Sequence, residues 1–210
     1  CEPRLERLFA RSFPEARIFA SKYEPAPEWT KEGTAIFAQI SAGTLPSLFR
    51  NRLEDFPPHT GYLRADPVAI EHWRARLSSL GEGLKIGISW AGGTARTRRA
   101  TRSIPLDDWH PVFEAPACHF ISLQYGNCGT EIADFMARSG ILLHHWPEAI
   151  DDYDNTAALV GALDLVISVT TSIVHLSGAL GQKVWVLVPA NPEWRYLHKG
   201  NSMPWYPSAR

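Results

Sequence analysis

The chain has 210 residues, of which 45% are hydrophobic, and its formal net charge is −1. This is enough apolar sequence for one large core or two small ones, and the near-neutral charge argues against a general nucleic-acid or membrane-surface binder. No apolar run approaches the ~20 residues that a membrane-spanning helix needs, and three cysteines without metal-ligand spacing favour a reducing compartment, taken as the cytoplasm.

Residues 1–83 show little regular pattern, because Pro and charged residues interrupt it, as in FPEARIFASKYEPAPEW. The exception is Val68–Leu80, an amphipathic stretch that predicts a helix with Asp66 as N-cap and Pro67 in its first turn. We interpret residues 1–83 as the remnant of an upstream domain plus a linker helix. A chain that begins with Cys rather than Met is expected to be a piece of a longer protein.

From about residue 84, short apolar runs alternate with helical patterns. Strands are predicted at Lys85–Trp90, His119–Gln124, Ile141–His145, Asp164–Val169 and Lys183–Val188. Helices are predicted at Pro105–Phe113, Thr130–Ser139, Asn155–Leu163 and Ser172–Leu180, the last with Gly181 as its stop. This alternation predicts an α/β fold, in which residues 84–210 form a Rossmann-like domain with a parallel sheet and right-handed crossovers.

In a parallel sheet of this kind, ligands bind beyond the carboxyl ends of the strands. The loop after the first predicted strand has two glycines, Gly92 and Gly93, that allow close backbone approach. It also has several guanidinium groups, which suit phosphate because their planar donors bind bidentately: Arg96, Arg98, Arg99 and Arg102. A solvated loop that keeps its charges for solubility is an equally weighted interpretation.

The fourth predicted strand ends in three hydroxyl residues: Thr170, Thr171 and Ser172. Simple N-capping explains one or two of them, whereas a helix N-terminus facing a basic loop also suits a pyrophosphate. His175 lies about one turn into the following helix. A histidine there is either a packing residue or a donor to a phosphate or a leaving group.

Two further strand-end loops carry polar residues. The acidic loop with Asp151, Asp152 and Asp154 could hold a metal or a ribose, or be a solvated turn in which Asp154 or Asn155 caps the next helix. The residues after the fifth predicted strand could frame a sugar or a base, although the tryptophan could equally belong to the core: Asn191, Glu193, Trp194 and Arg195. No G-x-G-x-x-G, P-loop or G-x-S-x-G motif occurs, which weakens NAD, ATPase and hydrolase interpretations.

Several segments together resemble a known family: ISWAGG, RSIPLDDW, FISLQYG, DNTAALVGALDLVISVTTSIVHLSGALGQKVWVLVPANPEWRYL and MPWYPSAR. They are similar to the glycosyltransferase domain found behind tetratricopeptide repeats in many bacterial proteins, which is related to the family 9 glycosyltransferases and their lipopolysaccharide heptosyltransferases. The resemblance covers residues 84–210 and extends loosely to about residues 39–80. It implies a GT-B architecture, with this chain as the C-terminal Rossmann-like domain plus part of the N-terminal one.

The resemblance also implies roles for single residues. His175 would stabilise the leaving group, and Thr170 stands where the family has Asp. Residues expected to bind a nucleotide-sugar donor are Gly92, Gly93, Arg102, Gln124, Thr170, Thr171, Ser172 and Glu193. We expect no metal and no cofactor besides the donor sugar nucleotide, because Arg102 and the helix N-terminus would neutralise the diphosphate, and we expect the general base to come from the N-terminal domain.

Three functions follow from these observations. The first is a metal-independent glycosyltransferase that acts on a glycan, a lipid-linked saccharide or a protein. The second is a non-catalytic module that binds a nucleotide-sugar or a glycan, which Thr170 and the missing base favour. The third, an interaction scaffold, rests only on the tetratricopeptide repeats expected upstream.

Overall fold

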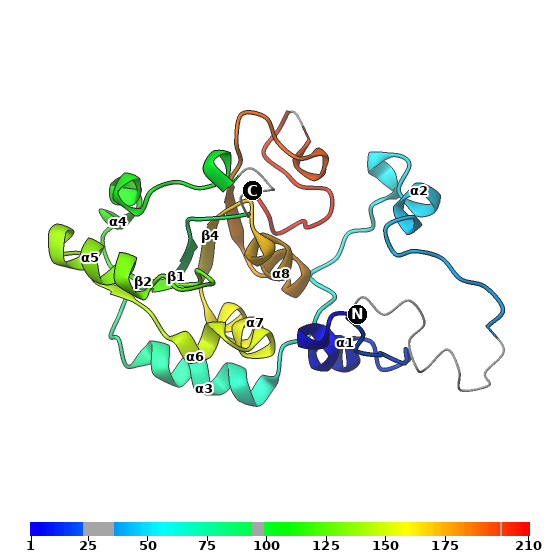
Figure 1. Cartoon of the computed structure of the whole chain (residues 1–210), viewed down its shortest axis with the longest axis horizontal. Helices are drawn as coiled ribbons and strands as arrows, with labels where there is room; N and C mark the ends of the chain where they lie inside the picture. Colours follow the sequence, from blue (N-terminus) through cyan, green and yellow to red (C-terminus); the bar gives the residue numbers. More distant parts are fainter. Residues whose placement is uncertain (23–35, 94–98, 198) are drawn as a thin grey trace.

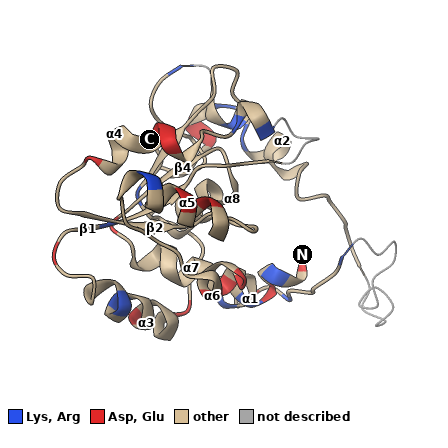
Figure 2. Ribbon diagram, turned by 60° about the vertical axis from the view of Figure 1, so that its left-hand side comes forward, with Lys and Arg blue, Asp and Glu red and all other residues tan. Residues whose placement is uncertain are grey.

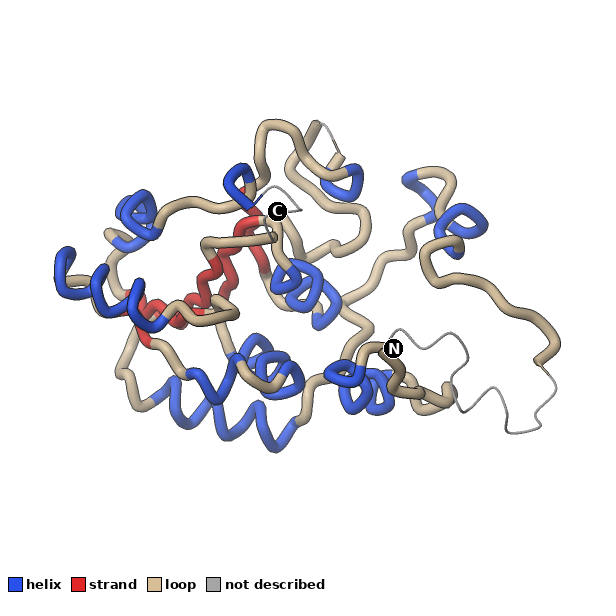
Figure 3. Tube along the Cα trace, in the orientation of Figure 1, coloured by secondary structure: helices blue, strands red, loops and turns tan. Residues whose placement is uncertain are grey.

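The computed structural model describes residues 1–22, 36–93, 99–197 and 199–210. Its centre is a parallel sheet with the strand order β3-β2-β1-β4-β5, flanked by helices (Figure 3). The strands are β1 (Leu84–Ser89), β2 (Cys118–Ser122), β3 (Leu143–His144), β4 (Leu165–Val169) and β5 (Val184–Leu187). All four pairings are parallel, which confirms the predicted α/β fold with a Rossmann-like sheet.

Two predicted elements differ from the structure. The third predicted strand, Ile141–His145, is reduced to β3, which pairs with β2 only at Phe120–Leu143 and Ile121–His144. The predicted helix Pro105–Phe113 is split into the 3-10 helix η6 (Leu106–Trp109) and α4 (His110–Phe113). Pro111 accounts for the split, because it has no N–H to continue an α-helical ladder from η6.

Helices cover both faces of the sheet. On one face, α4, η6 and α5 (Gly129–Ser139) pack on Ile88 and Ile167, and Phe135 is fully buried. On the other, Val166 lies in one cluster with residues of α3 (Pro67–Ser78), α7 (Tyr153–Ala162) and α8 (Ser172–Leu180). The remaining short helix, α6 (Pro147–Ile150), precedes α7. Strands covered on both faces bury residues at successive positions, which is the pattern of β1 and β4.

Residues from the N-terminal third of the chain join this core. Leu8 of α1 (Glu6–Ser12) is completely buried in the same cluster as Val166, next to the short helix η1 (Pro3–Leu5). Helix α3 begins where the sequence predicts, with Asp66 accepting hydrogen bonds from the amides of residues 68 and 69. By contrast, α2 (Leu45–Phe49) stands apart from the helices around the sheet (Figure 1).

The capping residues of α7 and α8 can be compared with those predicted from the sequence. Helix α7 is capped by Asp152, whose carboxylate accepts from the amides of Asp154 and Asn155, so the prediction of either of those two as the cap is wrong. Asp152 directly precedes the helix and has an extended backbone, so its side chain can turn back to accept from the first free amides. Helix α8 runs over the predicted residues, with Thr171 as N-cap and Gly181 as a left-handed C-cap at φ +77°.

The C-terminal segment closes the far edge of the sheet. The amide of Arg210 donates to the Val184 carbonyl at 2.9 Å, and the Val186 amide donates to the Arg210 carbonyl at 2.8 Å. Tyr206 packs on α8 at Gly178, where a β-carbon would lie 2.2 Å from Cγ of the tyrosine. These contacts cover the backbone groups of an edge strand that would otherwise be open.

Candidate functional site

The predicted ligand loops meet at the carboxyl ends of β1 and β4. These strands are neighbours, with Ser89 beside Ser168, and the strand order reverses between them, which makes this the switch point of the sheet. Gly92 lies against the hydroxyl turn: a β-carbon there would lie 2.9 Å from Thr171 Cγ2 and 3.1 Å from the Thr170 carbonyl oxygen. The glycine therefore lets the two loops approach each other.

Arg102 links the loops that follow three strands. Its Nε donates to Oγ1 of Thr170 at 3.1 Å, and its Nη2 donates to the Thr170 carbonyl. Its Nη1 lies 3.2 Å from Oε1 of Glu193, which comes after β5 and also pairs with Arg195. The structure thus brings together Arg102, Thr170 and Glu193, which are three of the residues predicted from sequence to bind a donor.

The start of α8 combines capping with an exposed polar end. Oγ1 of Thr171 accepts from the Ile173 amide at 3.2 Å and lies 3.1 Å from Oγ of Ser168, so its hydroxyl is used inside the protein. Thr170 and Thr171 are both buried, whereas Ser172 is exposed. Ser172 is therefore the hydroxyl of this turn that a ligand can reach.

A cavity of about 320 Å³ opens beside Arg102 and the first turn of α8. Its lining includes Arg4 and Tyr153, which the sequence analysis missed. The Arg4 guanidinium lies 5.1 Å from the centre of the Tyr153 ring. Arg4 belongs to η1 and carries no local signal, whereas Tyr153 directly follows the capping residue of a strand-end loop. The cavity is lined by Arg4, Gly93, Arg102, Leu123, Tyr125, Ile150, Tyr153, Thr156, Thr171, Ser172 and Ile173.

Gln124 lies beside a smaller neighbouring cavity of about 160 Å³, but its amide is used to hold the end of β1. Its Oε1 accepts from the amides of Trp90 at 3.1 Å and Ala91 at 2.9 Å, while its Nε2 donates to the Ala91 carbonyl at 2.9 Å. Gly93 and Tyr125 line both cavities, and Arg99 lines the smaller one. Arg96 and Arg98 lie outside the described residues.

His175 lines a different cavity from Arg102. Its Nδ1 lies 3.3 Å from the Tyr206 hydroxyl, and its ring faces a cavity of about 310 Å³. Burial lowers the pKa of His175, and the positive charge of Arg195 acts in the same direction. The arrangement favours a neutral imidazole, and the structure does not place His175 in the lining of the Arg102 cavity.

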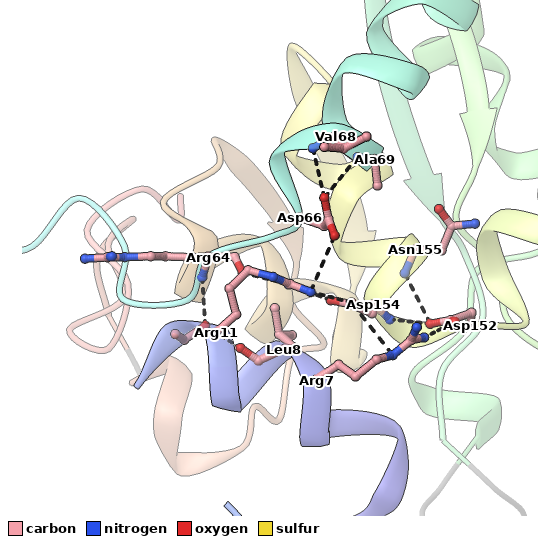
Figure 4. A network of polar contacts seen from close by, with 11 residues as sticks. Arg7, Leu8, Arg11, Arg64, Asp66, Val68, Ala69, Asp152, Asp154 and Asn155 are labelled. Atoms are coloured by element: carbon pink, nitrogen blue, oxygen red, sulfur yellow. Dashed lines mark hydrogen bonds and ion pairs between the residues drawn. The ribbon is translucent and has the colours of Figure 1, made fainter. Parts of the chain in front are cut away.

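The acidic loop pairs with basic residues of α1 (Figures 2 and 4). Asp154 is buried and accepts two hydrogen bonds from Arg11, at 2.9 and 2.7 Å, while Asp152 pairs with Arg7. These contacts place both carboxylates in the protein framework, in place of the metal or ribose site considered from sequence. Within the described residues, no group of three or more His, Cys, Asp or Glu side chains could hold a metal ion.

The loop after β5 is at the surface. The Trp194 side chain is 61% exposed, which excludes the alternative that it belongs to the core, and the Arg195 guanidinium lies 4.6 Å from the centre of its ring. The partly exposed Glu193 and Arg195 thus form one group with the exposed Trp194 at the side of Arg102. None of the described helices is long and apolar enough to cross a membrane.

Comparison with known sequences finds one informative relative. No family model matches the chain. The chain is 35% identical, over an alignment of 221 residues, to Protein FlbA of Caulobacter vibrioides. The alignment covers 100% of this chain and 36% of FlbA, so the chain spans about a third of the length of this relative.

Comparison with solved structures identifies the fold. ADP-heptose lipopolysaccharide heptosyltransferase II of E. coli matches 77% of this chain and 48% of its own, with a TM-score of 0.51 and 13% identity. A family 9 glycosyl transferase of Veillonella parvula matches 73% of this chain and 42% of its own, with a TM-score of 0.53 and 12% identity. The chain therefore has a fold like that of the family 9 glycosyltransferases, of GT-B type, and spans less than half of each neighbour.

Proposed function

We propose that this chain binds the donor in a glycosyltransferase that moves a sugar from a nucleotide diphosphate to an acceptor. The observation that carries the proposal is the cavity at the switch point, where Arg102, the exposed Ser172 and the N-terminus of α8 face the same space. The positive charge of Arg102 and the positive end of the α8 dipole at this place suit a diphosphate. The fold shared with heptosyltransferases supports the same class of reaction.

The geometry suggests how the leaving group is stabilised. As the bond between the sugar and the diphosphate breaks, negative charge grows on the phosphate oxygens. The guanidinium of Arg102 and the amides of α8 would stabilise that charge more than the charge of the intact donor, which lowers the barrier. Arg4 adds a second cation to the cavity, and we propose that these groups neutralise the diphosphate without a divalent ion.

We further propose the setting of this site in the full protein. Residues 84–210 would form the donor domain, and residues 1–83 would belong to the N-terminal domain and the linker. Tetratricopeptide repeats would precede them, in a cytoplasmic protein. The general base that takes the proton from the acceptor hydroxyl would come from the N-terminal domain, since the acceptor approaches the donor from across the cleft of a GT-B fold.

One observation favours a second candidate, a binding module without transfer activity. Thr170 stands where the family has Asp, and in the structure its side-chain oxygen accepts from Arg102 while its carbonyl accepts from the same residue. Threonine has no carboxylate to offer the donor sugar, and the hydroxyl that it has is already held by Arg102. Such a module would still bind the nucleotide.

Calorimetric titration with UDP, GDP, ADP and CMP tests the proposal. We expect one nucleoside diphosphate to bind selectively, and Arg102→Ala to weaken its binding roughly 10- to 100-fold, since a charge-assisted hydrogen bond is lost. Arg138→Ala is the matched control, because Arg138 is an exposed arginine that pairs with Asp107 and does not line the cavity.

The outcomes separate the candidates. If the wild-type chain unfolds normally on heating but binds none of the four nucleotides, the proposal of a donor site in this chain is contradicted. If one nucleotide binds, turnover of its sugar conjugate by the full-length protein supports transfer. Binding without turnover supports the non-catalytic module.

A further inference from the structure

The cavity at His175 lies between two short helical segments. One wall is apolar and comes from η1 and α1, with Leu5, Leu8 and Phe9, while the opposite wall comes from α8, with His175, Leu176 and Ala179. Its volume of about 310 Å³ is near the lower end of the range for small-molecule sites, roughly 300–1,000 Å³. The space suits a single ring system or a short chain.

This cavity adjoins the Arg102 cavity along α8. The first turn of α8 lines the Arg102 cavity through Ser172, and the following turns line the second cavity through His175 and Ala179. On the opposite wall, Arg4 faces the first cavity and Leu5 the second. Tyr153 lines both. A ligand in the second cavity therefore lies beside a ligand in the first.

His175 is the polar group of the α8 wall, and its surroundings favour a neutral imidazole. Nδ1 lies 3.3 Å from the Tyr206 hydroxyl, and burial lowers the pKa of the imidazole. When Nδ1–H donates to Tyr206, Nε2 carries the lone pair and accepts a hydrogen bond. No hydrogen bond to Nε2 is found within residues 1–22, 36–93, 99–197 and 199–210.

We infer that this second cavity is a ligand site for a small apolar alcohol, whose ring or chain packs between α1 and α8 and whose hydroxyl donates to Nε2 of His175. Most of the lining is apolar, and its side-chain hydrogen-bonding groups are those of His175 and of the tyrosines at 62, 153 and 206. A sugar bound there would therefore leave several of its hydroxyls unpaired at a cost. The inference rests on the proposed function only where it names this alcohol as the acceptor. The acceptor class is then an apolar alcohol rather than a glycan.

The test compares 2-naphthol with naphthalene, which differ by one hydroxyl, in fluorescence titrations of the whole chain. We expect 2-naphthol to bind roughly 2- to 10-fold more tightly, the range expected for one hydrogen bond. His175→Phe should remove this preference and leave naphthalene binding intact. Leu5→Trp, at a half-buried residue of η1, fills the cavity and should weaken binding of both ligands. Leu142→Trp, at an exposed leucine that lines neither cavity, should weaken neither.

The inference is overturned if the wild-type chain shows no preference for 2-naphthol, if His175→Phe keeps the preference, or if Leu5→Trp binds both probes as well as the wild type. Nucleotide titration of the same samples keeps the two proposals separate. Nucleotide binding without 2-naphthol binding removes the inference and leaves the proposed function. Binding of 2-naphthol without any nucleotide removes the proposed function and leaves a site for apolar alcohols.

Discussion

The Arg102 side chain contacts Thr170 and Glu193. In the proposed function, of these only the contact with Thr170 persists when a diphosphate binds. Thr170 holds the guanidinium through its side chain and its carbonyl, whereas Glu193 neutralises its charge from a partly exposed position. A diphosphate that binds Arg102 must compete with Glu193 for the same cation. Glu193 therefore sets how much affinity an anionic ligand gains at this site.

Replacing Glu193 tests that competition. We expect Glu193→Gln to tighten binding of the nucleoside diphosphate roughly 2- to 5-fold, as expected for removing a partly exposed ion pair. The gain should shrink at high salt, because salt screens the repulsion between Glu193 and the phosphates. Glu71→Gln, on α3 and outside the cavity, is the control for a lost negative charge. Weaker binding by Glu193→Gln would show that Glu193 contacts the ligand instead.

Gly178 shows how one missing side chain fixes a contact between distant segments. A β-carbon there would lie 2.2 Å from Tyr206 Cγ and 2.5 Å from its Cβ. We expect Gly178→Ala to lower the free energy of unfolding by about 1–3 kcal/mol, as overpacking does, although alanine is the better helix former. Urea denaturation measures the change.

Gly129 offers the matched control for that substitution. It lies at the start of α5, and a β-carbon there meets no atom within 4 Å. Gly129→Ala should therefore be neutral, or stabilise the fold by about 0.4–1 kcal/mol, since it restricts the unfolded chain. A similar loss of stability in both variants would mean that Tyr206 moves aside and that the cost has another source.

Among the elements, α1 depends on the rest of the molecule for its place. It has seven residues, and isolated helices shorter than about 12 residues are marginal in water. Its fold is stabilised by the burial of Leu8 and by the pairing of Arg11 with Asp154, and Arg11 also approaches Asp66 at 3.9 Å (Figure 4). The position of α1 also shapes the cavity at His175, because α1 forms one of its walls.

Replacing Arg11 tests how much its ion pair with Asp154 contributes to the stability of the protein. We expect Arg11→Met to destabilise the protein by about 2–3 kcal/mol, somewhat below the value for a fully buried pair, because the Arg11 side chain is 26% exposed. The cause is the buried Asp154 carboxylate left without a cation, so adding Asp154→Asn should restore part of the stability. Arg74→Met, which breaks an exposed pair within α3, should change stability by less than about 0.5 kcal/mol. Equal effects at both arginines would contradict this account.

For the whole molecule, stability should fall as the solution becomes acidic. The pKa values of His144, His145 and His175 are lowered from 6.5, in each case first by burial. The unfolded chain therefore binds more protons than the folded protein below about pH 6.5, so acid favours unfolding. We expect the melting temperature to decrease progressively between about pH 7.5 and pH 5.5.

A double variant separates these histidines from other groups. His144→Gln with His145→Gln should flatten the pH dependence of the melting temperature, because glutamine does not titrate and two of the three lowered pKa values are removed. The carboxylates of Glu148 and Asp152 have lowered pKa values and contribute only at more acidic pH. An unchanged slope in the double variant would mean that other groups take up the protons.

Local patterns were enough to predict most of the fold of residues 84–210. Helix α8 begins after Thr171 and ends at Gly181 as predicted, because an N-cap hydroxyl and a left-handed glycine act within a few residues. The strands were predicted to within two residues of their observed ends, since runs of apolar β-branched residues mark buried strands. The division of the predicted helix Pro105–Phe113 into η6 and α4 was not predicted, because it depends on a single backbone hydrogen bond that Pro111 cannot donate.

The sequence by itself determined the order of strands and helices along the chain, the parallel sheet and which loops lie at the carboxyl ends of its strands, because these follow from short-range patterns and the chirality of crossovers. Only the tertiary structure placed Arg4 and Tyr153 at the cavity of Arg102, turned His175 toward a separate cavity, and paired Arg11 with Asp154. Those contacts join residues far apart along the chain, and their partners depend on how helices pack, which no local pattern specifies.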